Sequence, residues 1–188
     1  MTMDMASQGE VGTGGAASAR ASVDIGGPTF YNTYRFEAFD RDGNPLWVEE
    51  VHNLVTTEGK TDVLSKYFKG SSYTAAWYVG ITGASPTFAA ADVMSSHSGW
   101  TEVTAYSESV RQTLSLGTPS AGSVDNSASK ATFSINADGT GIGGGFVVSN
   151  STKSGTTGVL YGGAAFTGGN KTLGNGDTLT VTVTLTQS

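Results

Sequence analysis

The sequence is short of the residues that build many reactive sites. It has no cysteine and only two histidines among its 188 residues, which excludes disulfides, thiolate nucleophiles and zinc sites made of thiolates. Ten Lys and Arg residues stand against 16 Asp and Glu residues. The basic residues are scattered, so they form no stripe that would bind a nucleic-acid backbone. No apolar run approaches the ~18 residues of a membrane span. We therefore expect neither a nucleic-acid nor a membrane partner.

The composition instead favours a chain of short strands. Glycine is abundant, with 27 residues, while 37% of the residues are hydrophobic and 10% are aromatic. This apolar content is too high for a chain that is disordered throughout. Glycine-rich turns between many short apolar segments are typical of all-β domains.

The clearest strand lies at the end of the sequence, over residues 177–186. Four apolar residues alternate there with threonines. Because successive side chains of a strand point to opposite faces, this segment has one apolar face and one threonine face. The apolar face needs a second layer to cover it, and residues 131–136 show the same alternation. From the two segments we expect six buried side chains: Leu179, Val181, Val183, Leu185, Phe133 and Ile135.

Other segments complete a sandwich. Strands are predicted at residues 30–39, 46–53, 75–81, 100–106, 110–116, 131–136, 142–149 and 159–166. Turn residues at 40–45 join the first two in a hairpin. Parallel pairing would need a helix between successive strands, and the sequence lacks such helices. We therefore predict an all-β fold: an antiparallel β-sandwich, jelly-roll-like, with one short helix and an extended N-terminal arm.

The single predicted helix runs from about Glu58 to Phe68. Thr57 is suited to cap its start, Glu58 is favoured by the helix dipole in the first turn, and Gly70 is suited to its end. The apolar residues of the segment fall on one stripe, which we expect to pack in the core. The stripe contains Val63, Leu64, Tyr67 and Phe68.

The chain divides into an N-terminal arm, residues 1–27, and a sandwich domain, residues 28–188. The arm has neither the basic start nor the apolar stretch of a secretory signal. Ordering a residue costs roughly 1–2 kcal/mol in backbone entropy, and the arm has few apolar groups to offset that cost. We expect it to be held by contacts with its own domain, a neighbouring copy or another partner. Its expected contact residues are Val11, Val23 and Ile25.

Candidate residues for catalysis are sparse. His52 and His97 lack the close spacing of metal ligands. Paired carboxylates could cleave a glycosidic bond if the fold brought them together, but the pattern does not favour this over solvated charges. The glutamates concerned are Glu49, Glu50, Glu102 and Glu108. We expect no catalytic residues, no cofactor and no metal, so the protein is predicted not to be an enzyme.

Four segments carry a resemblance to a known family. They are Trp77–Ile81, Ser96–Glu102, Thr132–Asn136 and Gly176–Leu179. Together they resemble a family of small tailed-bacteriophage virion proteins, over a region from about Tyr34 to the C-terminus. The resemblance implies a component of the phage particle and brings no catalytic residues with it. Small jelly-roll proteins of such particles commonly act as capsid cement or decoration.

From this resemblance we expect a capsid cement or decoration protein that binds and stabilises the shell. Its partners would be the major capsid protein and neighbouring copies of itself, as a dimer or trimer. It would assemble in the host cytoplasm and reside on the capsid surface of the virion, which is consistent with the missing secretory signal. Two alternatives stay open: a tail or fibre module for host recognition, and a virion-associated glycan hydrolase.

Overall fold

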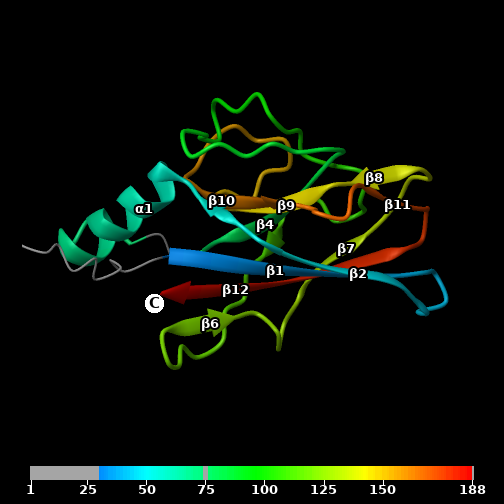
Figure 1. Ribbon diagram of the computed structural model, residues 1–188, viewed down its shortest axis with the longest axis horizontal. Coiled ribbons are helices and arrows are strands. Elements are labelled where there is room, and N and C mark those ends of the chain that lie inside the picture. Colours follow the sequence, from blue (N-terminus) through cyan, green and yellow to red (C-terminus); the bar gives the residue numbers. More distant parts are fainter. Residues whose placement is uncertain (1–29, 74–75, 188) are drawn as a thin grey trace, which may run out of the picture.

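The computed structural model describes residues 30–73 and 76–187, which form a sandwich of two antiparallel sheets (Figure 1). Sheet 1 contains β2 (Pro45–His52), β1 (Phe30–Phe39), β12 (Thr178–Gln187), β6 (Ser123–Asp125) and β7 (Ala131–Ser134). Sheet 2 contains β3 (Leu54–Val55), β10 (Leu160–Ala165), β9 (Gly144–Val148), β4 (Tyr78–Thr82) and β5 (Gln112–Thr113). A small ladder joins β8 (Thr140–Ile142) to β11 (Lys171–Leu173). The predicted antiparallel β-sandwich is confirmed, and its jelly-roll connectivity stays a prediction.

Sheet 1 is built around the long pair β1 and β12. The two strands pair over their whole length, with Phe36 opposite Val181, and β2 lies on the other side of β1. The turn between β1 and β2 is closed by the Asp40 carboxylate, which accepts hydrogen bonds from the amides of Asp42 (2.9 Å) and Asn44 (2.8 Å). The hairpin and the alternation predicted for β12 are therefore confirmed.

The core between the sheets contains the side chains expected there. Five of the six residues predicted to be buried are fully enclosed: Leu179, Val181, Val183, Phe133 and Ile135. Leu185 is half-buried and packs against the core. It differs from the others because it lies near the end of β12, where the sandwich opens.

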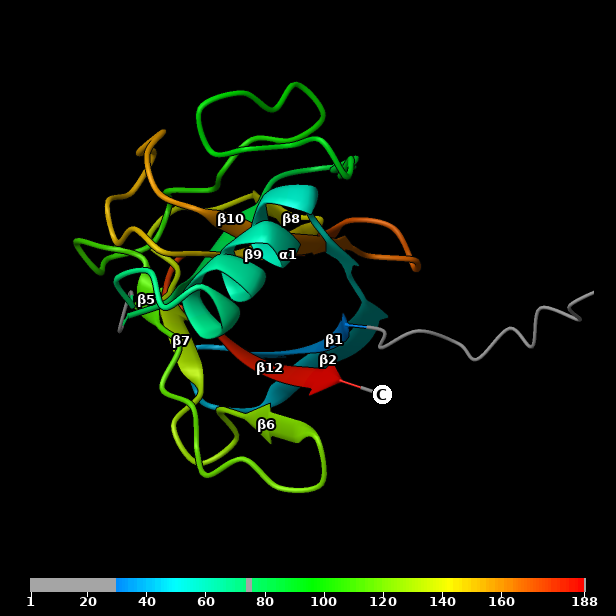
Figure 2. The same ribbon diagram turned by 90° about the vertical axis from the view of Figure 1, so that its left-hand side faces the viewer.

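Sheet 2 is buried on both faces. Val79, Ile81 and Val147 face the core shared with sheet 1. On the opposite face Phe146 belongs to a second apolar cluster with Trp100. The segment between β4 and β5 supplies that cover and crosses above the sheet in Figure 2, which views the molecule from its helix end. Each residue of β9 is buried as a result.

Two predicted strands are largely absent from the described residues. The segment predicted as a strand at 100–106 makes only single bridges, from Glu102 to Thr82 and from Tyr106 to Ile135. Of the predicted strand at 110–116 only β5 forms, with two residues. Trp100 packs onto the outer face of sheet 2, whereas Tyr106 and Leu114 enter the core between the sheets. The apolar character of both segments was therefore read correctly, but their backbone pairing was not.

Candidate functional site

The helix is fastened to sheet 2 by its first turn. Helix α1 (Thr57–Val63) continues as a wider π-helical turn, η1 (Leu64–Phe68). Its cap is Thr56, one residue before the predicted Thr57: the Thr56 hydroxyl accepts a hydrogen bond from the Gly59 amide (3.0 Å). The same hydroxyl donates to the carbonyl of Leu160 in β10.

Glycine at position 59 lets the helix approach β10 closely. A Cβ built at Gly59 would lie 2.5 Å from the carbonyl oxygen of Tyr161, which is a clash. The neighbouring Glu58 carboxylate accepts a hydrogen bond from the Leu160 amide (2.8 Å). Thr56, Glu58 and Gly59 are thus all held against one strand.

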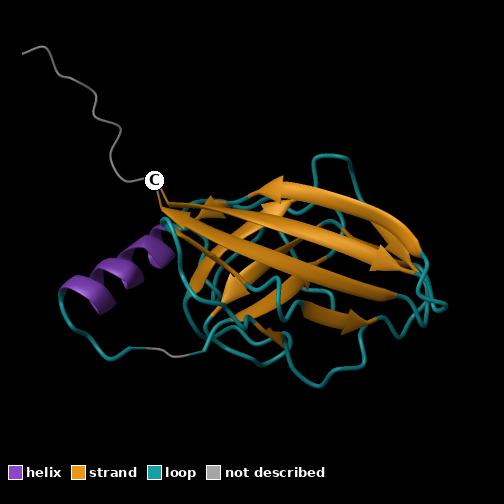
Figure 3. Cartoon of the chain, turned by 90° about the horizontal axis from the view of Figure 1, so that it is seen from below, coloured by secondary structure: helices purple, strands orange, loops and turns teal. Residues whose placement is uncertain are grey.

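Beyond this first turn the helix leaves the sandwich. Figure 3 shows it standing out past one end of the sheets. Leu64, Tyr67 and Phe68 are 55%, 81% and 73% exposed, and we call these three residues the helix crest. The prediction that they pack in the core is wrong, while Val63 does pack against it in part. Because the first turn is pinned on β10, the helix axis carries later residues away from the core. Gly70, with φ +66°, ends the helix as predicted.

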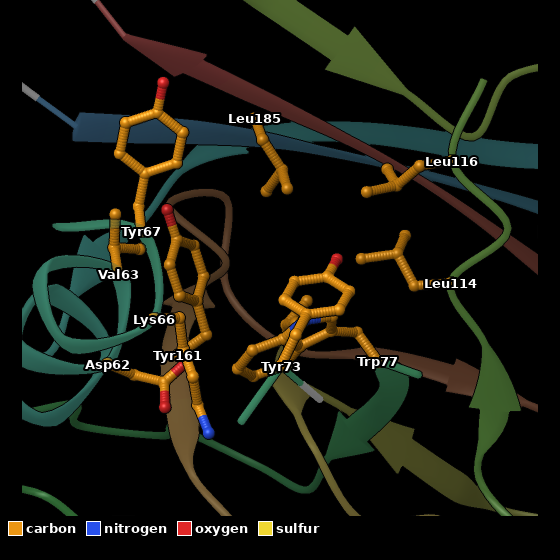
Figure 4. Close-up of a pocket in the computed structure, with 11 residues that line it drawn as sticks. Asp62, Val63, Lys66, Tyr67, Tyr73, Trp77, Leu114, Leu116, Tyr161 and Leu185 are labelled. Carbon is orange, nitrogen blue, oxygen red and sulfur yellow. The ribbon is translucent and has the colours of Figure 1, made fainter. Parts of the chain in front are cut away.

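An apolar cavity of about 350 Å³ lies where the helix meets the open end of the sandwich. Figure 4 shows side chains from the helix and both sheets around it. Trp77, Tyr161 and Leu185 form walls that come from three different parts of the chain, and Leu114 and Leu116 close the far side.

A shallower hollow of about 280 Å³ adjoins this cavity and shares Tyr161 and Leu185 with it. Phe30, the first described residue of the chain, lines the hollow together with the turn before β6. The apolar surface therefore extends from the helix to the point where β1 begins.

The polar groups at the cavity are few. Asp62 and Lys66 line it from the helix, and the Lys66 ammonium donates to the carbonyl of Ser72. Burial raises the pKa of the Tyr161 phenol above its ordinary value. This lining suits the binding of apolar side chains, because large apolar and aromatic surfaces bind such groups by excluding water.

The predicted carboxylates have structural partners. The side chain of Glu102 is buried and accepts hydrogen bonds from Arg111 at 2.8 and 2.9 Å. Glu108 accepts from the amide of Ser134 (3.1 Å), across to sheet 1. On β2, Glu49 lies 3.6 Å from the Lys171 ammonium and Glu50 lies 3.7 Å from the Arg35 guanidinium. Their partners place these groups in ion pairs and loop contacts of the sandwich.

The two histidines lie apart, one on a strand of sheet 1 and the other in the cover of sheet 2. His52 is exposed on β2, with its ring 3.2 Å from the Thr33 hydroxyl. His97 stacks on Trp100, with 3.6 Å between the ring centroids, in the cover of sheet 2. Within residues 30–73 and 76–187, no group of three or more His, Asp or Glu residues is placed to hold a metal ion.

The predicted contact residues of the arm, Val11, Val23 and Ile25, lie outside the described residues. Their role as contacts stays a prediction.

Comparison of the chain with protein-family models, with curated proteins and with solved structures finds no match. In the described part of the chain, no helix is both long and apolar enough to cross a membrane. The function must therefore be argued from the surface that the fold presents.

Proposed function

We propose that this protein is a structural component of a tailed-bacteriophage particle, a capsid cement or decoration protein that binds the major capsid protein shell and neighbouring copies of itself. Two observations support this. The resemblance of four sequence segments to small virion proteins supports the particle. The exposed helix crest of Leu64, Tyr67 and Phe68 supports attachment to another protein.

The helix crest carries the proposal because its exposure is costly for an isolated domain. The rings of Tyr67 and Phe68 contact each other edge to face, with centroids 5.0 Å apart, so they present one continuous apolar surface. Tyr73 stands nearby on the cavity rim and is 76% exposed. Aromatic residues are enriched at protein interfaces and supply much of their binding energy. A rigid β-sandwich with such a crest at one end is suited to clamp onto a shell.

The polar chemistry of the described residues is consistent with a passive role. The Arg111–Glu102 pair holds loops together, and Lys153 donates to the carbonyl of Tyr106 (2.7 Å) in the same layer. These groups stabilise the cover of sheet 2.

The test compares two pairs of exposed apolar residues on one domain. The crest variant is Tyr67→Ser with Phe68→Ser. The matched control is Leu46→Ser with Val48→Ser, two β2 residues that are 47% and 49% exposed. Each purified variant is titrated onto phage particles that lack the protein, and occupancy is measured by density on the particle.

We expect the crest variant to bind at least ten times more weakly and the control variant to bind like the parent. Equal binding by all three proteins would contradict attachment through the crest. The same particles, viewed by electron microscopy, report the location. Density on the tail or fibres would favour the host-recognition alternative, and glycan cleavage by the pure protein would favour the hydrolase.

A further inference from the structure

We propose that the helix-end cavity is the docking site for the N-terminal segment of the same chain, with Val23 and Ile25 as the side chains that enter it. The inference is independent of the proposed function, because it concerns how the chain completes its own fold. It assigns an occupant to the cavity lined by Trp77, Tyr161 and Leu185.

The first argument is position. The chain enters the described fold at Phe30, which lines the hollow that adjoins the cavity. In the next positions of β1, Asn32 pairs with Leu185, a residue common to the hollow and the cavity. Ile25 is separated from Phe30 by only a few residues, which can span at most about 17 Å when extended. The apolar side chains nearest to β1 in the sequence are therefore within reach of the cavity.

The second argument is the sequence between Ile25 and Phe30. From Phe30, β1 runs away from the helix end toward the opposite end of the sandwich (Figure 1). A segment preceding it must reverse direction to return to the cavity. Residues 26–28 read Gly-Gly-Pro, and both the Gly-Gly and the Gly-Pro pairs favour turns, since glycine accepts a positive φ without strain.

The third argument is chemical fit. Val23 and Ile25 are two positions apart, so an extended segment directs both side chains to one side and Asp24 to the other. Two branched aliphatic side chains suit a cavity whose walls are leucine and aromatic rings. A tethered segment also has an effective concentration on the order of millimolar, so a weak intrinsic affinity is sufficient for docking.

The test uses the absence of cysteine from the chain, because an introduced pair can form only one disulfide. The full-length variant Ile25→Cys with Leu116→Cys places one thiol on the segment and one on the cavity wall. A second variant, Ile25→Cys with Tyr67→Cys, uses a rim residue that is 81% exposed, so its substitution does not depend on repacking of the core. The control is Ile25→Cys with Leu46→Cys, whose second thiol lies at the other end of the sandwich. Dilute proteins are oxidised, and products are resolved by non-reducing electrophoresis and mass spectrometry.

We expect both cavity pairs to form a single-chain disulfide at least ten times faster than the control pair. Equal rates for the cavity and control pairs would overturn the proposal. A product that is chiefly a cross-linked dimer would also overturn it, because the segment would then occupy a neighbouring copy. The proposed function is tested by a separate measurement, the binding of the helix-crest variants to particles. Neither result of the disulfide experiment decides that test.

Discussion

The two sheets share one core but differ on their outer faces. The outer face of sheet 1 is open and carries threonine and charged side chains, among them Arg35 and Glu37. The outer face of sheet 2 is covered by a second apolar cluster that contains Trp100 and Phe146. A sheet with one solvent-exposed face shows a strict alternation of apolar and polar residues in its sequence, whereas a sheet that is buried on both faces does not. A charged substitution should therefore be tolerated on the outer face of sheet 1 but not on its inner face or on either face of sheet 2.

The largest expected effect comes from placing a charge on the inner face of sheet 1. Val183 is fully buried on β12. An aspartate there would bring an unpaired charge into a dry layer, so we expect Val183→Asp to lower the free energy of unfolding by about 5 kcal/mol or more, enough to prevent folding. Chemical denaturation followed by circular dichroism measures the change.

The control is the same charge on the outer face of sheet 1. Thr132 is exposed on β7, and Thr132→Asp should change the free energy of unfolding by less than about 0.5 kcal/mol, as is usual for surface substitutions. A melting temperature of Val183→Asp equal to that of the parent would show that β12 does not bury this face.

The alternation explains why the longer strands of sheet 1 could be predicted from the sequence, whereas the three-residue β6 was not. On β12 every second residue is apolar, and β1 and the hairpin turn at Asp40 have equally plain signals. On sheet 2, glycines take positions where large neighbours need room: a Cβ at Gly80 would lie 2.2 Å from the ring of Phe146. A glycine in a strand sequence does not reveal which side chain covers it. Of sheet 2, strands β4, β9 and β10 were predicted, but β3 and the loop layer over the sheet were not.

The second prediction concerns that loop layer. Arg111 is fully buried and donates to Glu102, to the carbonyl of Asn150 (2.9 Å) and to the carbonyl of Gly155 (2.9 Å). Its guanidinium also lies over the ring of Phe146. Arg111→Met should lower the free energy of unfolding by about 3–5 kcal/mol, because it leaves the buried Glu102 carboxylate without its partner. Denaturant titration measures the change in the free energy of unfolding. The rate of amide hydrogen exchange should rise most, relative to the parent protein, in residues 83–111 and 149–159.

The double variant Arg111→Met with Glu102→Gln separates the charge from the packing. It should be more stable than Arg111→Met alone, since the orphaned charge is gone. A double variant that is as unstable as the sum of the two single variants would show that the pair does not act as a unit.

The candidate site was only half visible in the sequence. The stripe of Leu64, Tyr67 and Phe68 was recognised, but an amphipathic stripe looks the same whether it meets the core or a partner. What decides its fate is the close seating of Gly59 on β10, a contact between distant parts of the chain. The cavity was also invisible, because Trp77, Leu114 and Leu185 come together only when both sheets are in place. No local sequence pattern predicts a cavity whose walls come from such distant parts of the chain.

The smallest predicted effect returns to the open face of sheet 1. There the Lys130 ammonium donates a hydrogen bond to Glu37 and, with Arg35 adding to the effect, holds the pKa of the Glu37 carboxyl below its usual value. A carboxyl whose pKa is lower in the folded state stabilises the fold fully above its unfolded pKa, about 4.3, and loses that contribution as the pH falls through the folded pKa. We expect Glu37→Gln to cost about 0.2–1 kcal/mol at pH 7, and the difference from the parent to shrink as the pH falls below the unfolded pKa and through the lower folded pKa. Unfolding titrations between pH 7 and pH 3 measure this, with added salt shrinking the difference because the pair is near solvent. A Glu37→Gln variant whose stability runs parallel to that of the parent over the whole range would show that the pair adds nothing to this face.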